Sequence, residues 1–175
     1  MHPNTLGPIH YAPGDVDTEQ CTPPTAMPDW KEGPTIAFLV DFLDPNTKLP
    51  NFRVYYQDAP TNAPIGYVPS AVLADKRIDL ALLCVGSYDQ VTNQPTDTIA
   101  ALSPRFVLGG HWENFFQPMT APIAPIPLLD VDKWKTLAST ALPDGGDPDP
   151  IVMDGAPTSL RAIVPSPGDV FQLAQ

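Results

Sequence analysis

The sequence predicts an α/β fold in which short crossover helices join the strands of a mixed sheet. Residues 78–85 form a nearly continuous apolar run, which is typical of a strand buried on both faces of a parallel sheet. Residues 96–102 can form a helix, with Pro95 suited to its first turn and Pro104 placed to stop it. Residues 105–110 supply a second apolar strand, so the three segments together predict a βαβ unit.

Composition narrows the possible partners and compartments. The chain has 175 residues, 43% of them hydrophobic, which is enough for one domain with a real core. Its formal net charge is −11 and its nine basic residues are scattered, so we expect neither nucleic acid nor a membrane surface as a partner. No stretch approaches the roughly 20 apolar residues of a membrane span. No signal peptide pattern is visible at Met1, so the cytoplasm is the default expectation, and the compartment itself is left open.

The 24 prolines predict many loops, above all near the amino terminus. Residues 1–34 contain Pro or Gly in every possible periodic run, so we expect an irregular lead-in followed by one folded unit over residues 35–175. Cys21 and Cys84 are too few and too far apart to predict a disulfide framework or a cysteine-based zinc site.

Two strands and a helix are expected before the βαβ unit. Residues 35–43 and 52–57 are rich in β-branched and aromatic side chains and lie close enough in sequence for an antiparallel hairpin. Asp58 comes directly after the second strand. Residues 69–75 (PSAVLAD) resemble a short helix that begins with proline.

The carboxyl-terminal third is predicted to add one helix and a sheet edge. Beyond residue 111 four prolines indicate an extended surface segment, and residues 130–139 predict a helix with acidic residues in its first turn. Residues 143–150 are expected to form a loop. Residues 159–164 and 169–173 predict two short strands on either side of a proline-glycine turn.

The candidate site residues are Asp58, His111 and His10. Right-handed crossovers place the carboxyl ends of successive parallel strands on one edge, so Asp58 and His111 should share the edge where α/β sheets bind ligands. Imidazole and carboxylate are the usual ligands of zinc in hydrolytic sites. The alternative interpretation is that Asp58 belongs to a solvated turn or a helix cap, and His10 is a less secure candidate ligand.

The order of five segments resembles the carboxyl-terminal half of the metallo-β-lactamase fold, in its broad hydrolase branch. The segments are FLVDF, FRVYYQDAP, RIDLALLCVGSYDQ, LSPRFVLGGHWENFF and IVPSPGDVFQL. The resemblance implies half of an αββα sandwich, with Asp58 as the carboxylate that bridges two zinc ions and His111 as the last histidine ligand. It also implies hydrolysis of a small-molecule substrate.

The chain departs from the family pattern in two places. The motif H-x-H-x-D-H, which supplies most of the family's ligands, does not occur, and Gln57 stands where the family usually has glycine before the bridging Asp. His10 matches the family's middle histidine motif by order only. We therefore expect an incomplete site with little or no turnover, and an uncovered sheet face through which the domain could associate.

A second hypothesis is a degenerate, non-catalytic scaffold that binds other proteins. Trp112, Phe115 and Phe116 follow His111 directly, and aromatic residues in a loop at a strand end can anchor a partner. The same residues would equally suit the lip of a substrate pocket or an ordinary core. Metal binding that depends on Asp58 and His111 would separate the two hypotheses.

Overall fold

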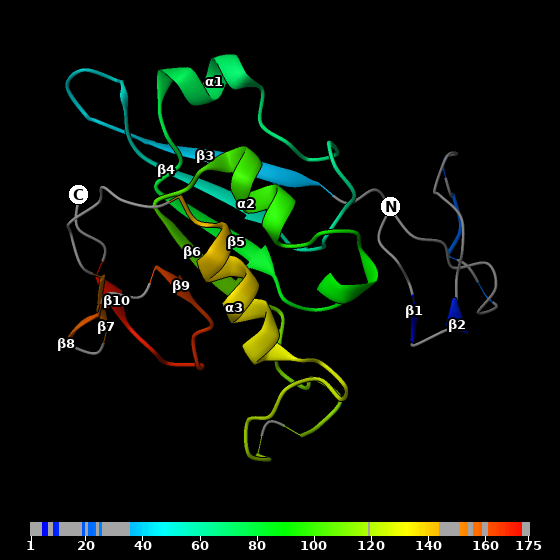
Figure 1. Ribbon diagram of the computed structural model, residues 1–175. Helices are drawn as coiled ribbons and strands as arrows, with labels where there is room; N and C mark the ends of the chain where they lie inside the picture. Colours follow the sequence, from blue (N-terminus) through cyan, green and yellow to red (C-terminus); the bar gives the residue numbers. More distant parts are fainter. Residues whose placement is uncertain are drawn as a thin grey trace.

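A computed structural model describes residues 36–118, 120–143 and 161–172, together with residues 19, 21–23 and 25 and the backbone of four short strands outside these ranges. The described residues form a mixed α/β fold with a five-stranded mixed sheet and three short helices (Figure 1). The fold class predicted from the sequence is confirmed at this level.

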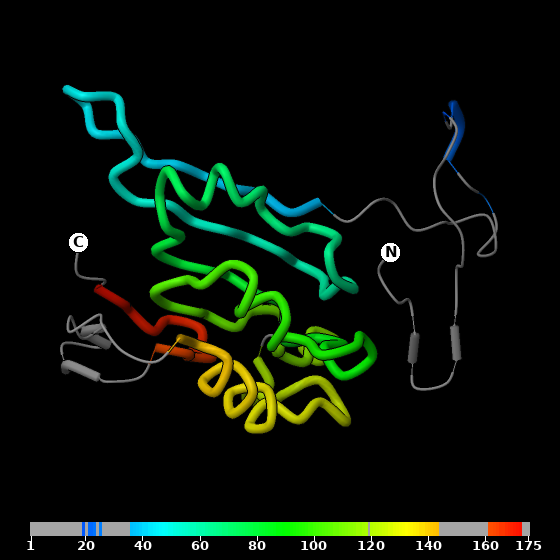
Figure 2. Tube along the Cα trace, turned by 45° about the horizontal axis from the view of Figure 1, so that its top comes forward, coloured from blue at the N-terminus to red at the C-terminus, as the bar shows by residue number. Residues whose placement is uncertain are grey.

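The strands of the sheet lie side by side in the order in which they occur in the chain. Their order is β3 (Ala37–Leu43), β4 (Pro50–Gln57), β5 (Leu80–Cys84), β6 (Phe106–Gly110) and β9 (Ala162–Ile163). In Figure 2 the colours accordingly pass from cyan through green to red across the sheet. β3 and β4 pair as the predicted antiparallel hairpin, and every later pair is parallel.

All three α-helices pack on the same face of this sheet. They are α1 (Ser70–Asp75), α2 (Thr96–Leu102) and α3 (Val131–Ala141). Each helix connects two neighbouring parallel strands, and each connection moves in the same direction across the sheet. Right-handed crossovers then have to place every helix on one side, which Figure 1 shows facing the viewer. A 3₁₀ turn, η2 (Tyr88–Gln90), precedes α2.

The helix boundaries follow from local sequence. α2 ends at Leu102 and is followed by Ser103, whose φ of 44° is left-handed, and by Pro104, as the sequence predicted. Asp130 precedes α3, and its side chain accepts a hydrogen bond of 2.9 Å from the backbone N–H of Lys133. These caps satisfy backbone groups that the ends of a helix leave unpaired.

The hydrophobic core lies between the sheet and the helices. Tyr55, Leu83 and Val107 point toward the helices from three adjacent strands, and Trp134 of α3 is fully buried against them. Gly109 makes this packing possible. A Cβ added there would lie 2.7 Å from Val85 Cγ2 and 2.8 Å from Trp134 Cζ3, closer than real side chains come.

No described helix covers the other face of the sheet, which corrects one prediction. The apolar run over residues 78–85 predicted a strand buried on both faces, but Leu80 and Leu82 of β5 are only half-buried. Alternate side chains of β5 point to opposite faces of the sheet. Those on one face pack against the helices, and those on the other face belong to a continuous apolar surface. That face extends to β3, where Phe38, Val40 and Phe42 are exposed.

Strand pairs outside the main sheet account for the remaining elements. β7 (Ile151–Met153) and β8 (Ala156–Thr158), which the sequence did not predict, form a three-stranded sheet with β10 (Phe171–Gln172). β10 falls within the strand predicted over residues 169–173, whereas β9 falls within the strand predicted over 159–164 and joins the main sheet.

The predicted irregular lead-in, residues 1–34, lies mostly outside the described residues. Its described backbone includes β1 (Thr5–Leu6) and β2 (Ile9–His10), which pair antiparallel. The loop predicted over residues 143–150 also lies outside them, apart from its first residue.

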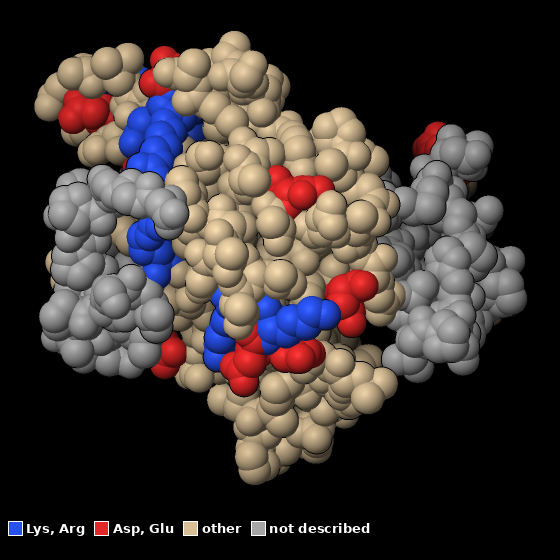
Figure 3. Space-filling view, in the orientation of Figure 1, with Lys and Arg blue, Asp and Glu red and all other residues tan. Residues whose placement is uncertain are grey.

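Ionic side chains gather at the amino ends of the parallel strands. Asp79, at the start of β5, is 2% exposed and lies 2.8 Å from Lys76 Nζ and 3.3 Å from Arg105 Nη1. Arg53 of β4, also 2% exposed, forms a bidentate pair with Asp41 at 2.6 and 2.8 Å. Figure 3 shows basic side chains collected beside α1 and on α3, while much of the visible face is uncharged.

Candidate functional site

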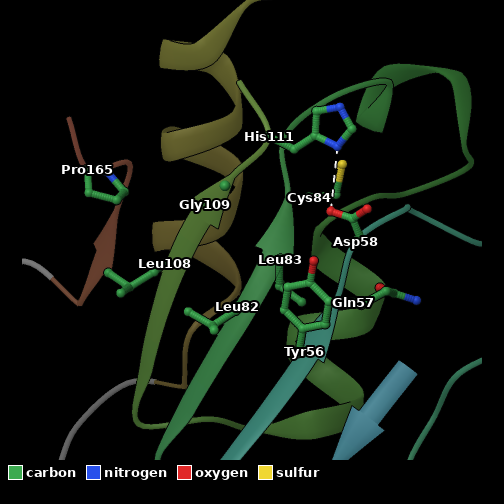
Figure 4. A pocket seen from close by; sticks show the side chains of 11 residues that line it. Tyr56, Gln57, Asp58, Leu82, Leu83, Cys84, Leu108, Gly109, His111 and Pro165 are labelled. Carbon is green, nitrogen blue, oxygen red and sulfur yellow. Dashed lines mark ion pairs between the residues drawn. The ribbon is translucent and has the colours of Figure 1, made fainter. Parts of the chain in front are cut away.

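Asp58 and His111 converge at the carboxyl edge of the sheet. Asp58 follows β4 directly, His111 follows β6 directly, and β5 lies between these two strands. His111 Nδ1 lies 3.6 Å from Asp58 Oδ1, as Figure 4 shows by a dashed line. The side chains are 37% and 60% exposed. The juxtaposition predicted from strand order is therefore observed, across 53 positions of sequence.

The backbone around His111 holds the imidazole in this position. His111 has a φ of 57°, a left-handed conformation that few non-glycine residues adopt. The carbonyl of the preceding Gly110 accepts a 2.9 Å hydrogen bond from Val85 N–H, and the indole N–H of Trp112 donates to the carbonyl of Pro165 at 3.0 Å. Because both neighbours of His111 are anchored, the chain turns sharply at the histidine itself and directs its ring toward Asp58 (Figure 4).

The pair lies in an open hollow of about 260 Å³. Tyr56, Leu82 and Leu108 form its floor from three adjacent strands, and all three belong to the sheet face without helices. Its other lining residues are Gln57, Asp58, Leu83, Cys84, Gly109, Gly110, His111 and Pro165. The hollow is thus built on the uncovered face and has no wall opposite that face among the described residues.

The sequence did not identify two polar side chains beside Asp58 as part of the site. Tyr56 and Cys84 line the hollow, and Figure 4 shows both side chains directed toward the space around Asp58. The signal was present in the period of two that governs strands: Tyr56 stands two positions before Asp58, so both residues leave the chain on the same side. Cys84 lies near the end of the apolar run over residues 78–85 and is buried, although it also lines the hollow.

Burial and the carboxylate keep these two side chains protonated. Burial, followed by the charge of Asp58, raises the pKa of the Cys84 thiol from 9.0 to about 12, and the thiol lies 3.3 Å from the carbonyl of Gly86. Burial also raises the pKa of Tyr56, with Asp58 as the second cause. Tyr56 therefore approaches Asp58 as a neutral hydrogen-bond donor at neutral pH, whereas the Cys84 thiol donates to the carbonyl of Gly86.

The donor types suit zinc, but their number falls short of a complete site. Two ligands at about 2.0 Å from a tetrahedral ion lie roughly 3.3 Å apart, close to the separation of the Asp58 and His111 atoms. Structural and catalytic zinc sites use three or four protein ligands. Within the described part of the chain, no three His, Cys, Asp or Glu side chains are arranged to hold a metal ion.

His10, the third predicted ligand, is not tested by this geometry. Its backbone belongs to β2, where it pairs with Thr5, and its side chain lies outside the described residues. Its assignment stays a prediction.

Comparisons with known proteins do not assign a family. A scan against models of protein families, a search of curated proteins and a search of solved structures each found no match for this chain. Among the described helices, none has the length and apolar character needed to cross a bilayer.

Proposed function

We propose that this chain supplies the Asp58–His111 part of a zinc-dependent hydrolase site, as the carboxyl-terminal half of a metallo-β-lactamase-like sandwich. The observation that carries the proposal is the 3.6 Å approach of His111 Nδ1 to Asp58 Oδ1. Two side chains of ligand type, held at the ends of β4 and β6 on either side of β5 and more than a third exposed, are available to an incoming ion.

The uncovered sheet face supports the same proposal. A sandwich buries one face of each sheet against helices and the other face against a second sheet, which requires an apolar face without helices. The rows Val40–Val54–Leu80 and Phe38–Tyr56–Leu82 provide such a face next to the hollow. A second layer there would both bury the face and close the hollow over Asp58.

Within the site, the chain's own residues would bind, orient and donate. A zinc ion supplies Lewis acidity, which polarises the bond to be cleaved and activates water. Asp58 provides the negative charge that attracts the cation, and His111 presents Nδ1 to the same position. Tyr56, kept protonated, can donate a hydrogen bond to Asp58 or to a substrate oxygen.

Two ligands alone imply weak binding and little turnover. The missing donors would have to come from His10, from other residues outside the described ranges or from a partner. We expect hydrolysis of simple esters and lactams by this polypeptide to be slow or undetectable. Rapid turnover by the chain alone would mean that other residues carry the chemistry.

Equilibrium dialysis against zinc, followed by metal analysis, tests the proposal. The wild-type chain should bind zinc, and Asp58→Asn and His111→Gln should each weaken binding by roughly tenfold or more. Asp132→Asn is the matched control, since Asp132 is 93% exposed on α3, on the helix side of the sheet rather than on the face that carries the hollow. Equal zinc affinity in all four proteins, or none in the wild type, would contradict the proposal.

The second candidate function is a non-catalytic scaffold that binds another protein. It is favoured by Phe115 and Phe116, which are 61% and 73% exposed and whose ring centroids lie 4.4 Å apart. The Phe115 ring centroid also lies 5.7 Å from that of His111. The dialysis experiment separates the two functions, because the zinc content of a scaffold would be insensitive to Asp58→Asn. Phe115→Ala, in contrast, would reduce the binding of a protein partner to a scaffold.

A further inference from the structure

The sheet face opposite the helices is apolar across four strands. Cross-strand neighbours form two rows, Phe38–Tyr56–Leu82–Leu108 and Val40–Val54–Leu80–Phe106, and Phe42 faces Phe52 beyond them. Every side chain in these rows is uncharged. Such a face costs free energy in water, in proportion to the apolar area it leaves exposed.

The open part of this face lies over β3 and β4. Phe38 is 51% exposed, Val40 45%, Phe42 57% and Tyr56 38%. At the opposite side of the sheet, Phe106 and Ile163 are already buried, with Phe171 of β10 packed against them. Because no described residue covers this face of β3 and β4, a partner there would meet these two strands and the adjoining part of β5.

The open area is close to what an interface needs. Together with their half-buried neighbours, these side chains present roughly 600 Å² of apolar surface, which is the upper range for the largest patch on a monomer. A standard interface buries about 800 Å² on each partner. The aromatic side chains already pack against one another before any partner binds. The ring centroids of Phe38 and Tyr56 lie 6.3 Å apart, and those of Phe42 and Phe52 lie 6.2 Å apart.

The chemistry of the face favours an identical partner. A partner recognised by charge would find no complementary group in the rows described above. A second copy offers the same uncharged surface with the same twist, and two sheets of equal twist pack face to face at about −30° with their side chains interdigitated. The chain's net charge of −11 opposes dimerisation only through side chains that lie off these rows.

We propose that this uncovered face, formed by β3, β4 and β5, is the interface of a symmetric dimer in which a second copy of the chain packs sheet on sheet. The second copy also completes the hollow, whose floor residues Tyr56 and Leu82 belong to the same face. Each Asp58–His111 pair then gains a wall from the partner subunit. The inference requires no metal and goes beyond the proposed hydrolase function.

Sedimentation equilibrium of the full 175-residue chain tests the proposal. The measurement is made in EDTA, so its outcome is separate from zinc binding. The wild type should have the mass of a dimer, and raising NaCl from 50 mM to 1 M should strengthen association or leave it unchanged, because salt screens the repulsion between two acidic chains. Val40→Glu should weaken dimerisation by roughly a hundredfold or more, because it places a charge in an apolar interface.

Leu128→Glu is the matched control, because Leu128 is 98% exposed in a loop outside the face. It should dimerise like the wild type. Phe38→Lys provides a second position on the face if Val40→Glu fails to fold, as judged by circular dichroism. A monomeric wild type, including one whose face instead accepts a different protein, would overturn the proposal. So would assemblies larger than a dimer, or equal effects of the face variants and Leu128→Glu.

Discussion

The two ends of the parallel strands use the same kinds of residues for opposite purposes. At the amino ends, Asp79 is 2% exposed and is surrounded by Lys76 Nζ, Arg105 Nη1 and the backbone N–H of Arg53, the last at 2.8 Å. At the carboxyl ends, Asp58 is 60% exposed and lies 3.6 Å from His111, beyond hydrogen-bonding distance. A carboxylate with all its partners stabilises the fold, whereas one that keeps its lone pairs accessible can bind something else.

Arg53 extends the contrast. Its guanidinium is saturated by the two Asp41 oxygens and by the carbonyls of Val72 and Lys76, so it fastens the edge hairpin to α1. His111 has no comparable set of acceptors among the described residues. The amino edge is therefore held by a closed set of ion pairs and hydrogen bonds, whereas the carboxyl edge leaves the Asp58 and His111 side chains accessible.

Of the substitutions that test this difference between the two edges, Asp79→Ala should lower the free energy of unfolding the most. Removing the carboxylate leaves Lys76, Arg105 and the Arg53 N–H without their buried acceptor, so we expect the free energy of unfolding to fall by about 3–5 kcal/mol. Urea unfolding followed by circular dichroism measures it. Asp58→Ala, at the opposite edge, should change stability by only about 0.5 kcal/mol. Similar losses in the two variants would break the distinction between the edges.

Gly109→Ala should come next. The added methyl group meets Val85 and Trp134 below 3.0 Å, and overpacking of this kind costs about 1–3 kcal/mol. Gly110→Ala is the control one residue nearer the site, because a Cβ there meets nothing within 4 Å. Urea midpoints for the two variants should differ clearly; equal midpoints would show that α3 can shift away from β6.

A smaller effect should appear in the pH dependence of stability. The hydrogen bond from Arg53 lowers the pKa of Asp41 from 3.8. The ionised carboxylate therefore stabilises the fold above its ordinary pKa, and this contribution is lost as the pH falls through the lower folded-state pKa. Asp41→Asn should be less stable than wild type at pH 6, and the difference should shrink toward pH 2.5. A constant difference across that range would exclude the ion pair as its cause.

The least disruptive test of the carboxyl edge is thiol labelling. Because burial and Asp58 raise the pKa of Cys84 from 9.0 to about 12, its thiolate fraction at pH 8 should be roughly a thousandfold below that of an ordinary thiol. Iodoacetamide should therefore modify the exposed Cys21 before the buried Cys84. Mass spectrometry measures the labelling rate of each thiol separately, Cys21 in the Cys84→Ser variant and Cys84 in the Cys21→Ser variant. Equal labelling of the two cysteines would mean that the floor of the hollow is more open than described.

Local signals in the sequence were sufficient for the main sheet and its helices. Proline at the start of α1, the Ser103-Pro104 stop after α2 and the acidic first turn of α3 act within a few residues, so the sequence alone located these elements. Strand order and crossover handedness then predicted that Asp58 and His111 would meet.

Features that depend on long-range packing were not visible in the sequence. The run over residues 78–85 is equally apolar whether or not a second layer covers it, so periodicity could not reveal the exposed face. Cys84 is buried, as its apolar neighbours indicate, but the sequence did not show that its side chain also lines the hollow. β7 and β8 are three residues each, too short for a pattern of period two to be recognised.

The most direct test of the central claim is a zinc titration of the ¹⁵N-labelled chain, monitored through the imidazole nitrogens of His111. Because Nδ1 faces Asp58, a shared ion should shift the Nδ1 resonance while Nε2 stays protonated, and Asp58→Asn should move the midpoint to roughly tenfold higher zinc. An unchanged His111 spectrum, or a shift at Nε2 that is insensitive to Asp58→Asn, would contradict the account.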